Sequence, residues 1–372
     1  MQQESVLQIV STQALRSHAE SWDALWRRSD VTDPSARAAL MSQWLDTFAS
    51  AQDFRAIVIQ KDNRFLAALP LLHRRVGRMF DAYDLPGNDW SGAGDLLIDP
   101  SEDAAVLCDQ LVAELAILPR SLFWFGSVAT DRFRWQQFLA ALERAQIQTQ
   151  LHPRYDVGWL DLQDTWQQTE AKWSSKFRRR LRKSKRQLEE NGPLRMEVLR
   201  PRCEEELVTP LMTCLELEDA GWKGRDGTSI IRSPGIQDFV LAQARQLAEW
   251  GHIEIVMLMQ DEQLLAYQYA WQAKDVYHGF KTAYDERYAK FGPGQLLMYM
   301  LLEQLVARPE CRGVDCMGPV NDAVRRWQPE LRPVGRLVFA PGPVGRVFLS
   351  AYRYLSPSWR RLRDAVRTSV NL

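Results

Sequence analysis

KTAYDERYAKFGPGQLLMYMLLEQL, residues 281–305, is the most informative segment of this sequence. A β-strand is predicted to end at Tyr284, and an apolar helix is predicted to begin directly after Gly292-Pro293-Gly294. Such a helix start presents unpaired backbone N–H groups and the positive end of the helix dipole at one point. Phosphate binds well there, because glycines let the backbone approach a ligand closely. Taken alone, the pattern is more often a plain turn.

The elements around this stretch predict the fold of the second half. In chain order they are a strand at 195–200, a helix at 203–219, a Gly-rich loop at 220–235, a helix at 236–250, strands at 252–260, 264–273 and 276–284, a helix at 294–307, and strands at 313–317 and 335–340. This order suits a mostly antiparallel sheet with helices on both faces and one parallel crossover.

The first half repeats this order without close sequence identity. Its expected elements are helices at 14–28 and 36–50, a hairpin of 54–59 and 64–72, a turn-rich stretch at 85–100, a helix at 102–117, a strand at 121–126 and a helix at 131–145. We therefore predict an α/β (α+β) protein of two related domains. The expected ranges are 1–155 and 156–340, with a basic amphipathic tail at 341–372.

Composition narrows the classes of function. The chain has 372 residues, 47 Lys+Arg and 47 Asp+Glu, so its net charge of zero gives no bulk attraction to nucleic acid. Five scattered cysteines without a CxxC pair argue against a disulfide framework or a zinc site. The N terminus does not resemble a signal peptide, and no run approaches the roughly 18–20 apolar residues of a membrane span. The sequence predicts a cytoplasmic protein.

Several blocks of the sequence resemble one family in their order along the chain. They are LPGNDWSGAGDLLIDP (85–100), KFRRRLRKSKRQL (176–188), LELEDAGWKGRDGTSI (215–230), KTAYDERYAKFGPGQLL (281–297) and VDCMGPVNDAVRRW (314–327). On these blocks the chain is similar to the CelD/FemAB-like acetyltransferases of the GNAT superfamily. The family usually has Ser or Thr where this chain has Gly292. Many members read Tyr-Lys where this chain has Arg325-Arg326 before Trp327.

The resemblance implies tandem GNAT-like domains and an N-acyltransferase. Its donor would be acetyl-CoA or a longer acyl-CoA, and its acceptor an amine of a sugar, a polysaccharide precursor or a lipid-like molecule. Attack would be direct, without a covalent nucleophile or a metal. Two alternatives stay open: a Fem-type aminoacyltransferase that uses aminoacyl-tRNA, and a non-catalytic GNAT-fold scaffold in a polysaccharide-synthesis complex.

The resemblance also nominates residues for the donor. Its pyrophosphate would bind the loop before the helix, which here comprises Phe291, Gly292, Pro293, Gly294, Gln295 and Leu296.

Amine acylation needs a base, a polarised carbonyl and a group that stabilises the leaving thiolate. Glu218 aligns with the family's acidic position and is the first candidate base, although it also suits a solvated helix end. His278 is a second candidate base or a structural strand residue. Lys281 or Tyr284 would stabilise the thiolate. Asp315 would orient the amine, or cap a turn at the end of a strand.

The remaining candidates concern the acceptor. Trp222 and Lys223 lie in a Gly-rich loop and suggest a lid or a stacking platform, whereas the alternative is a tryptophan that anchors the loop to the core. Asp285 begins the donor loop and is expected to tie it down through N–H groups. Trp327 completes the substrate-binding set.

Two basic segments suggest contact with an anionic partner. Residues 172–186 carry nine Lys/Arg and no acid, with a narrow apolar stripe, and the tail 341–372 is basic and aromatic. The segment 172–186 could bind a phosphate of CoA, an anionic lipid surface or RNA, and both segments fit peripheral attachment to the inner membrane. The alternatives are a solvated helix face and a tail packed on the first domain. Nucleic acid is not expected, because no aromatic platform for stacking bases is evident.

Overall fold

A computed structural model describes residues 4–50, 53–76, 80–119 and 122–342, together with Val347 and Leu349. The described chain forms two compact units, the first from residues 4–31, 35–154 and 333–342 and the second from 32–34 and 155–332. Residues 333–340 therefore fold with the first unit, whereas the sequence analysis placed them in the second domain, 156–340. Nearly all of the expected tail at 341–372 lies outside the described residues.

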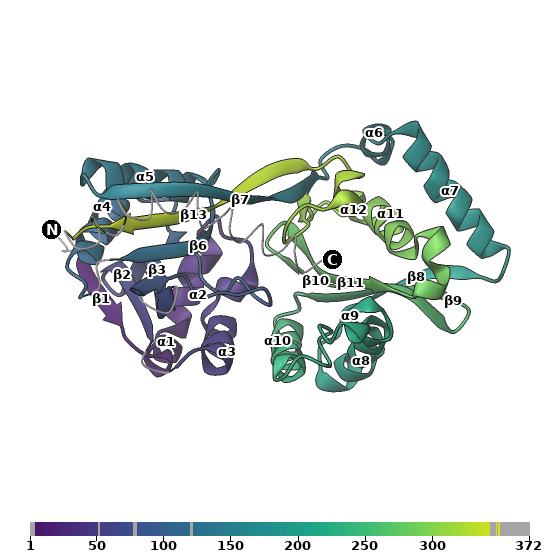
Figure 1. The fold of residues 1–372 in the computed structure, drawn as a ribbon, viewed down its shortest axis with the longest axis horizontal. Coiled ribbons are helices and arrows are strands. Elements are labelled where there is room, and N and C mark those ends of the chain that lie inside the picture. The colour runs from purple at the N-terminus through teal and green to yellow at the C-terminus, as the bar shows by residue number, and fades with distance from the viewer. Residues whose placement is uncertain are drawn as a thin grey trace. The chain divides into compact units, whose positions relative to one another are not determined.

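The first unit contains a mixed, mostly antiparallel sheet in the order β1-β2-β3-β4-β6-β13. The strands are β1 (Ser5–Ile9), β2 (Phe54–Lys61), β3 (Arg64–Val76), β4 (Phe80–Asp84), β6 (Phe123–Ala129) and β13 (Glu330–Ala340), with β5 (Leu97–Ile98) paired to β3. Among the described residues of this unit, β4 and β6 pair in parallel and the other neighbours are antiparallel. In Figure 1, α1 (Thr12–Ser17), α2 (Ala19–Arg28) and α3 (Ala38–Phe48) lie on one face, and α4 (Ala104–Ala116) and α5 (Phe133–Arg144) on the other.

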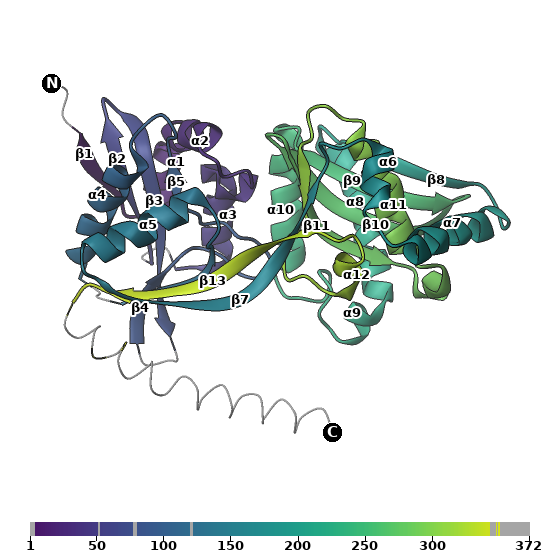
Figure 2. The same cartoon turned by 90° about the horizontal axis from the view of Figure 1, so that it is seen from above.

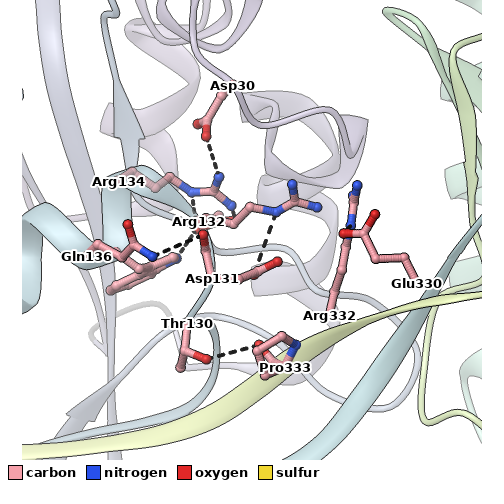
Figure 3. Close-up of polar contacts among 11 residues, drawn as sticks. Asp30, Thr130, Asp131, Arg132, Arg134, Gln136, Glu330, Arg332 and Pro333 are labelled. Atoms are coloured by element: carbon pink, nitrogen blue, oxygen red, sulfur yellow. Dashed lines mark hydrogen bonds and ion pairs between the residues drawn. The ribbon is translucent and has the colours of Figure 1, made fainter. Parts of the chain in front are cut away.

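Local chemistry explains how this unit closes. Asp62 and Asn63 both have positive φ angles, of 50° and 63°, which is the conformation that a two-residue hairpin between β2 and β3 requires. The buried Arg134 forms an ion pair with Asp30 at 2.9 Å (Figure 3). Thr130 donates its hydroxyl to the main-chain oxygen of Pro333 at 3.2 Å (Figure 3). This contact and the antiparallel pairing of β13 with β6 hold residues from 333 onward in the first unit.

The second unit has the strand order β7-β12-β11-β10-β9-β8. The strands are β7 (Gln148–Asp161, entering from the first unit), β8 (Leu194–Leu199), β9 (Ile253–Gln260), β10 (Gln263–Ala273), β11 (Val276–Tyr284) and β12 (Gly313–Asp315). Neighbours are antiparallel except β11 and β12, which run in parallel. The chain thus makes the predicted single crossover.

Helices cover both faces of this sheet (Figures 1 and 2). One face carries α8 (Glu204–Ala220), α9 (Trp222–Arg225) and α10 (Ile236–Glu249). The other carries α6 (Trp166–Ala171), α7 (Ser175–Glu189) and α11 (Pro293–Val306), while α12 (Asp322–Arg325) follows β12. The α11 residues Leu296, Leu301 and Leu305 are fully buried against the sheet. The predicted fold class, two mixed sheets with helices on both faces, is confirmed.

None of the helices within the described residues combines the length and the apolar character needed to cross a bilayer.

Candidate active site

The sheet of the second unit opens between two parallel strands. β11 and β12 pair only through Val276↔Gly313, Tyr277↔Val314 and His278↔Asp315. β12 ends at Asp315, whereas β11 continues to Tyr284 beside β10. The later part of β11 therefore has no strand of the second unit on its β12 side, and its backbone groups there are available to an extended ligand.

A β-bulge lies at the start of this opening. Tyr269 pairs with Lys281 and Ala270 pairs with Gly279, so Phe280 has no opposite residue on β10. A bulge increases the local twist of a strand and redirects the backbone groups around it, and bulges are common beside active sites.

Two residues predicted from the sequence, His278 and Asp315, lie opposite each other where β11 and β12 separate. Residues paired across neighbouring strands point to the same face, so Trp271, His278 and Asp315 form one row across β10, β11 and β12. His278 is 2% exposed, and its ring stacks on that of Trp271 with the ring centroids 6.3 Å apart. His278 Nε2 finds no hydrogen-bond partner among the described residues. A buried polar nitrogen without a partner is costly, so it is a candidate contact for substrate or water.

The end of β11 leads into a tightly held loop. Asp285 accepts hydrogen bonds from the Arg287 main chain and guanidinium and from the Gln263 side chain. The hydrogen bond from the Arg287 side chain holds the pKa of Asp285 below its ordinary value. The 3-10 helix η2 (Glu286–Phe291) follows and ends at Gly292. Asp285 thus ties down the loop.

The start of α11 is bare of side-chain caps. Gly292 is the N-cap residue in the left-handed region, at φ 61° and ψ 55°, and no side chain accepts from the first N–H groups. Pro293 has no N–H, so the first N–H of the helix belongs to Gly294. A Cβ at Gly294 would meet only Tyr284 Cδ1, at 3.7 Å. Gln295 N and Leu296 N both donate to Gly292 O at 3.0 Å, so the helix N-terminus presents the Gly294 N–H and the helix dipole beside the end of β11.

We expect Gly292→Ala to lower the free energy of unfolding by about 1–2 kcal/mol, because an L-residue in the left-handed conformation is strained by about that amount. Gly294→Ala is the matched control. Its backbone is not left-handed and its Cβ has room, so it should be neutral or stabilising. Urea unfolding of both variants checks this, and equal stabilities would contradict it.

The equivalent positions of the first unit are already filled by carboxylates. Asp103 caps α4 by accepting from Ala105 N at 2.9 Å and Val106 N at 3.3 Å. Between β4 and β6, Asp84 accepts from Gly126 N at 2.7 Å, and burial raises the pKa of this carboxyl. The open strand gap and the uncapped helix thus occur together in the second unit.

Glu218 is buried in a structural network. It is 3% exposed, accepts from Lys223 Nζ at 2.5 Å and from Ile230 N at 3.0 Å, and so ties the loop after α8 to the helix. Both carboxylate oxygens are engaged, which disagrees with its expected role as a free base. Lys223, in turn, is held by Glu218 and is not directed at a substrate.

Glu286 links the Gly-rich loop to the donor loop and was not predicted from the sequence. It accepts from Trp222 N at 2.9 Å and pairs with Arg225 at 2.9 Å. The Trp222 side chain remains 53% exposed. Trp222 is therefore a surface aromatic fixed beside η2 and not a core anchor. A carboxylate one residue after Asp285 gave no sequence signal that distinguished it from an ordinary surface residue.

Other predicted residues are dispersed. Lys281 is half-buried and Tyr284 exposed, both on the open part of β11. Trp327 is 3% exposed and packs edge-on against Trp173 and Phe177, with ring centroids 4.8 and 5.0 Å apart, so its ring anchors the core.

In the donor loop Phe291 packs on the core and Leu296 is fully buried, while Gln295 is half-buried. Within the described residues, no three His, Cys, Asp or Glu side chains form a metal-binding group.

Comparisons with known proteins agree with this geometry. The model of the acetyltransferase (GNAT) domain matches residues 175–325, the part that holds the strand gap and α11. FemX shares the fold, with a TM-score of 0.59 and 12% identity over 85% of this chain and 95% of FemX. A conserved protein of unknown function from Bacteroides thetaiotaomicron does so with a TM-score of 0.54 and 13% identity, over 91% of this chain and 100% of that one. A comparison with curated protein sequences gives no match.

The family model covers the candidate site itself, and the FemX-like fold extends over most of the chain. Residues 175–325 match the acetyltransferase (GNAT) domain, within a chain whose overall fold is like that of FemX.

Proposed function

We propose that the second unit transfers an acyl group from acyl-CoA to an amine. The donor diphosphate would bind the N-terminus of α11, and the thioester would lie in the gap between β11 and β12. The observation that carries this proposal is the combination of an open strand gap with an uncapped helix start. In the first unit Asp84 and Asp103 occupy both positions, so the proposal assigns the donor to the second unit.

Lengths along β11 decide which residues meet the thioester. The pantetheine arm has about as many backbone bonds as four extended residues, or about 14 Å. A diphosphate at Gly294 lies beside Tyr284, because a Cβ there would touch the Tyr284 ring. Four residues back along the strand lies Phe280, the site of the bulge. This places the sulfur near Phe280 and Lys281 and makes Tyr284 a contact of the diphosphate end.

The reaction then follows from the groups around the bulge. The neutral amine nitrogen attacks the thioester carbonyl carbon, a C–N bond forms and the C–S bond breaks. Backbone N–H groups redirected by the bulge polarise the carbonyl. His278 accepts the proton from the amine, directly or through a water, and Asp315 orients the amine. Lys281 stabilises the departing thiolate.

The acceptor class is an amine carried by a sugar, a polysaccharide precursor or a lipid-like molecule. Trp222 supports this proposal, because an exposed ring fixed beside the donor loop offers a flat apolar surface for stacking.

Trp222→Ala is expected to raise the acceptor KM by about tenfold, which corresponds to the loss of about 1.4 kcal/mol of stacking. The KM for acyl-CoA should stay unchanged. Steady-state kinetics on an accepted amine measure both. A rise confined to the acyl-CoA KM would refute the assignment, and Trp222→Phe, which keeps an aromatic ring, should behave almost as the parent.

A thermal-shift panel tests the proposed donor. Acetyl-CoA or a longer acyl-CoA at about 100 times Kd should stabilise the protein by about 2.7 kcal/mol and raise Tm by several degrees. Stabilisation by aminoacyl-tRNA with no response to any CoA would instead support a Fem-type aminoacyltransferase. Binding of acyl-CoA without turnover on a broad amine panel would support a non-catalytic scaffold.

A further inference from the structure

Helix α7 concentrates positive charge on a chain whose net charge is zero. Its fifteen residues include eight Lys or Arg and one acid, Glu189. Its apolar stripe packs into the core of the second unit, where Phe177, Leu181 and Leu188 are buried. The helix therefore has no apolar face left for insertion into a bilayer, and any partner must be recognised by charge.

Five of these cations form one row on the exposed side of α7. The row consists of Lys176, Arg179, Arg180, Lys183 and Arg186. Their spacing of three or four residues places them on one helix face, over a length of about 15 Å.

The row has no acidic counterpart in the fold. Within the described part of the chain none of the five forms an ion pair, whereas their neighbour Arg182 pairs with Glu170 at 2.7 Å and Lys185 lies 3.9 Å from Glu189. Like charges three or four residues apart on a helix destabilise it. The row thus weakens the isolated helix and forms no compensating contact within the described fold.

We propose that this row, the α7 cationic row, docks the protein on a bilayer surface rich in anionic phospholipid. Each Lys or Arg near such a surface adds to the attraction, and no insertion is needed. Nucleic acid fits less well, because single strands are bound by grooves lined with exposed aromatic rings. The aromatic residues of the basic segment 172–186, Trp173 and Phe177, are both buried, and the row lies on a convex helix face.

Docking through α7 would bring the donor loop near the bilayer. α7 contacts both η2 and α11 within the second unit. A lipid-carried acceptor would then diffuse to the site in two dimensions. The docking proposal itself does not depend on the proposed chemistry, and its test needs no activity.

The test is cosedimentation of the full chain with vesicles. The chain should bind phosphatidylcholine vesicles that contain phosphatidylglycerol, should not bind phosphatidylcholine alone, and should dissociate as NaCl rises from about 0.05 to about 0.5 M. Replacing all five residues of the row with Gln should lower the partition coefficient by at least about a hundredfold. Gln is a good helix former, so circular dichroism should be unchanged.

Two control variants distinguish binding through the α7 cationic row from binding that depends only on the net charge of the protein. R179K/R180K/R186K keeps the charge and should bind as the parent does. A variant with five Gln substitutions in the first unit loses the same charge and should also bind; its positions are Arg16, Arg27, Lys61, Arg75 and Arg144. The proposal is overturned by equal binding of the parent to both vesicle types, by no binding, or by full binding of the five-Gln row variant. Loss of tRNA binding in that variant, without vesicle binding by the parent, would identify a nucleic-acid surface instead.

Discussion

Gly294→Val is expected to lower the affinity for acyl-CoA by at least about a hundredfold while the fold stays intact. The valine methyl groups would occupy the space in front of the α11 N-terminus and would keep a diphosphate from its N–H groups. A Cβ at this position meets only Tyr284, at an ordinary 3.7 Å, so the protein itself accommodates the change. Valine is also a better helix former than glycine.

Isothermal titration with acetyl-CoA measures this effect. Gly92→Val is a suitable control, because Gly92 is exposed in the first unit and a Cβ there meets nothing within 4 Å. The control should bind acetyl-CoA with unchanged affinity, and both variants should unfold at a Tm close to that of the parent. Unchanged affinity of Gly294→Val for acetyl-CoA would show that the diphosphate does not bind at this helix.

His278→Asn is expected to lower kcat by about 10² to 10⁴, the usual range for loss of a positioned acid–base group. The KM for acyl-CoA should change little, since in the proposed arrangement the diphosphate end of the donor would lie far along β11.

Trp271→Phe serves as the control for this second prediction. It keeps an aromatic ring against His278 but replaces the indole, with its N–H, by a smaller phenyl ring, so kcat should remain within a few fold of the parent value. A kcat for His278→Asn that equals the control would exclude the imidazole as the base.

The fold was largely predictable because its strongest patterns are local. β9 is buried along its whole length, and β9, β10 and β11 are joined by short turns, so three apolar runs in sequence indicated a meander. The predicted helix at 294–307 begins one residue earlier, at Pro293, a residue common at the first helical position.

β7 was not predicted, and β13 was predicted only at 335–340 and within the second domain, because both strands depend on distant partners. β7 is a 14-residue strand that contains Pro153 and few buried residues, so its alternation is weak. β13 joins the first unit through pairing with β6, about 200 residues earlier. Neither local propensity nor periodicity carries information about such pairings.

The candidate site was predictable only in part, for the same reason. The Gly-Pro-Gly helix start is a local signal. The neighbourhood of His278 and Asp315 instead arises from the parallel register of β11 and β12, which are separated in sequence by α11. The engagement of Glu218 by Lys223 and Ile230 likewise exists only once the loop after α8 has folded back.

A crystal structure of the chain with CoA tests the central claim most directly. The account predicts a diphosphate oxygen within hydrogen-bond distance of Gly294 N, with the pantetheine arm running beside β11 from Tyr284 toward Phe280. Ordered CoA bound away from the α11 N-terminus, or seated at α4 of the first unit, would contradict it.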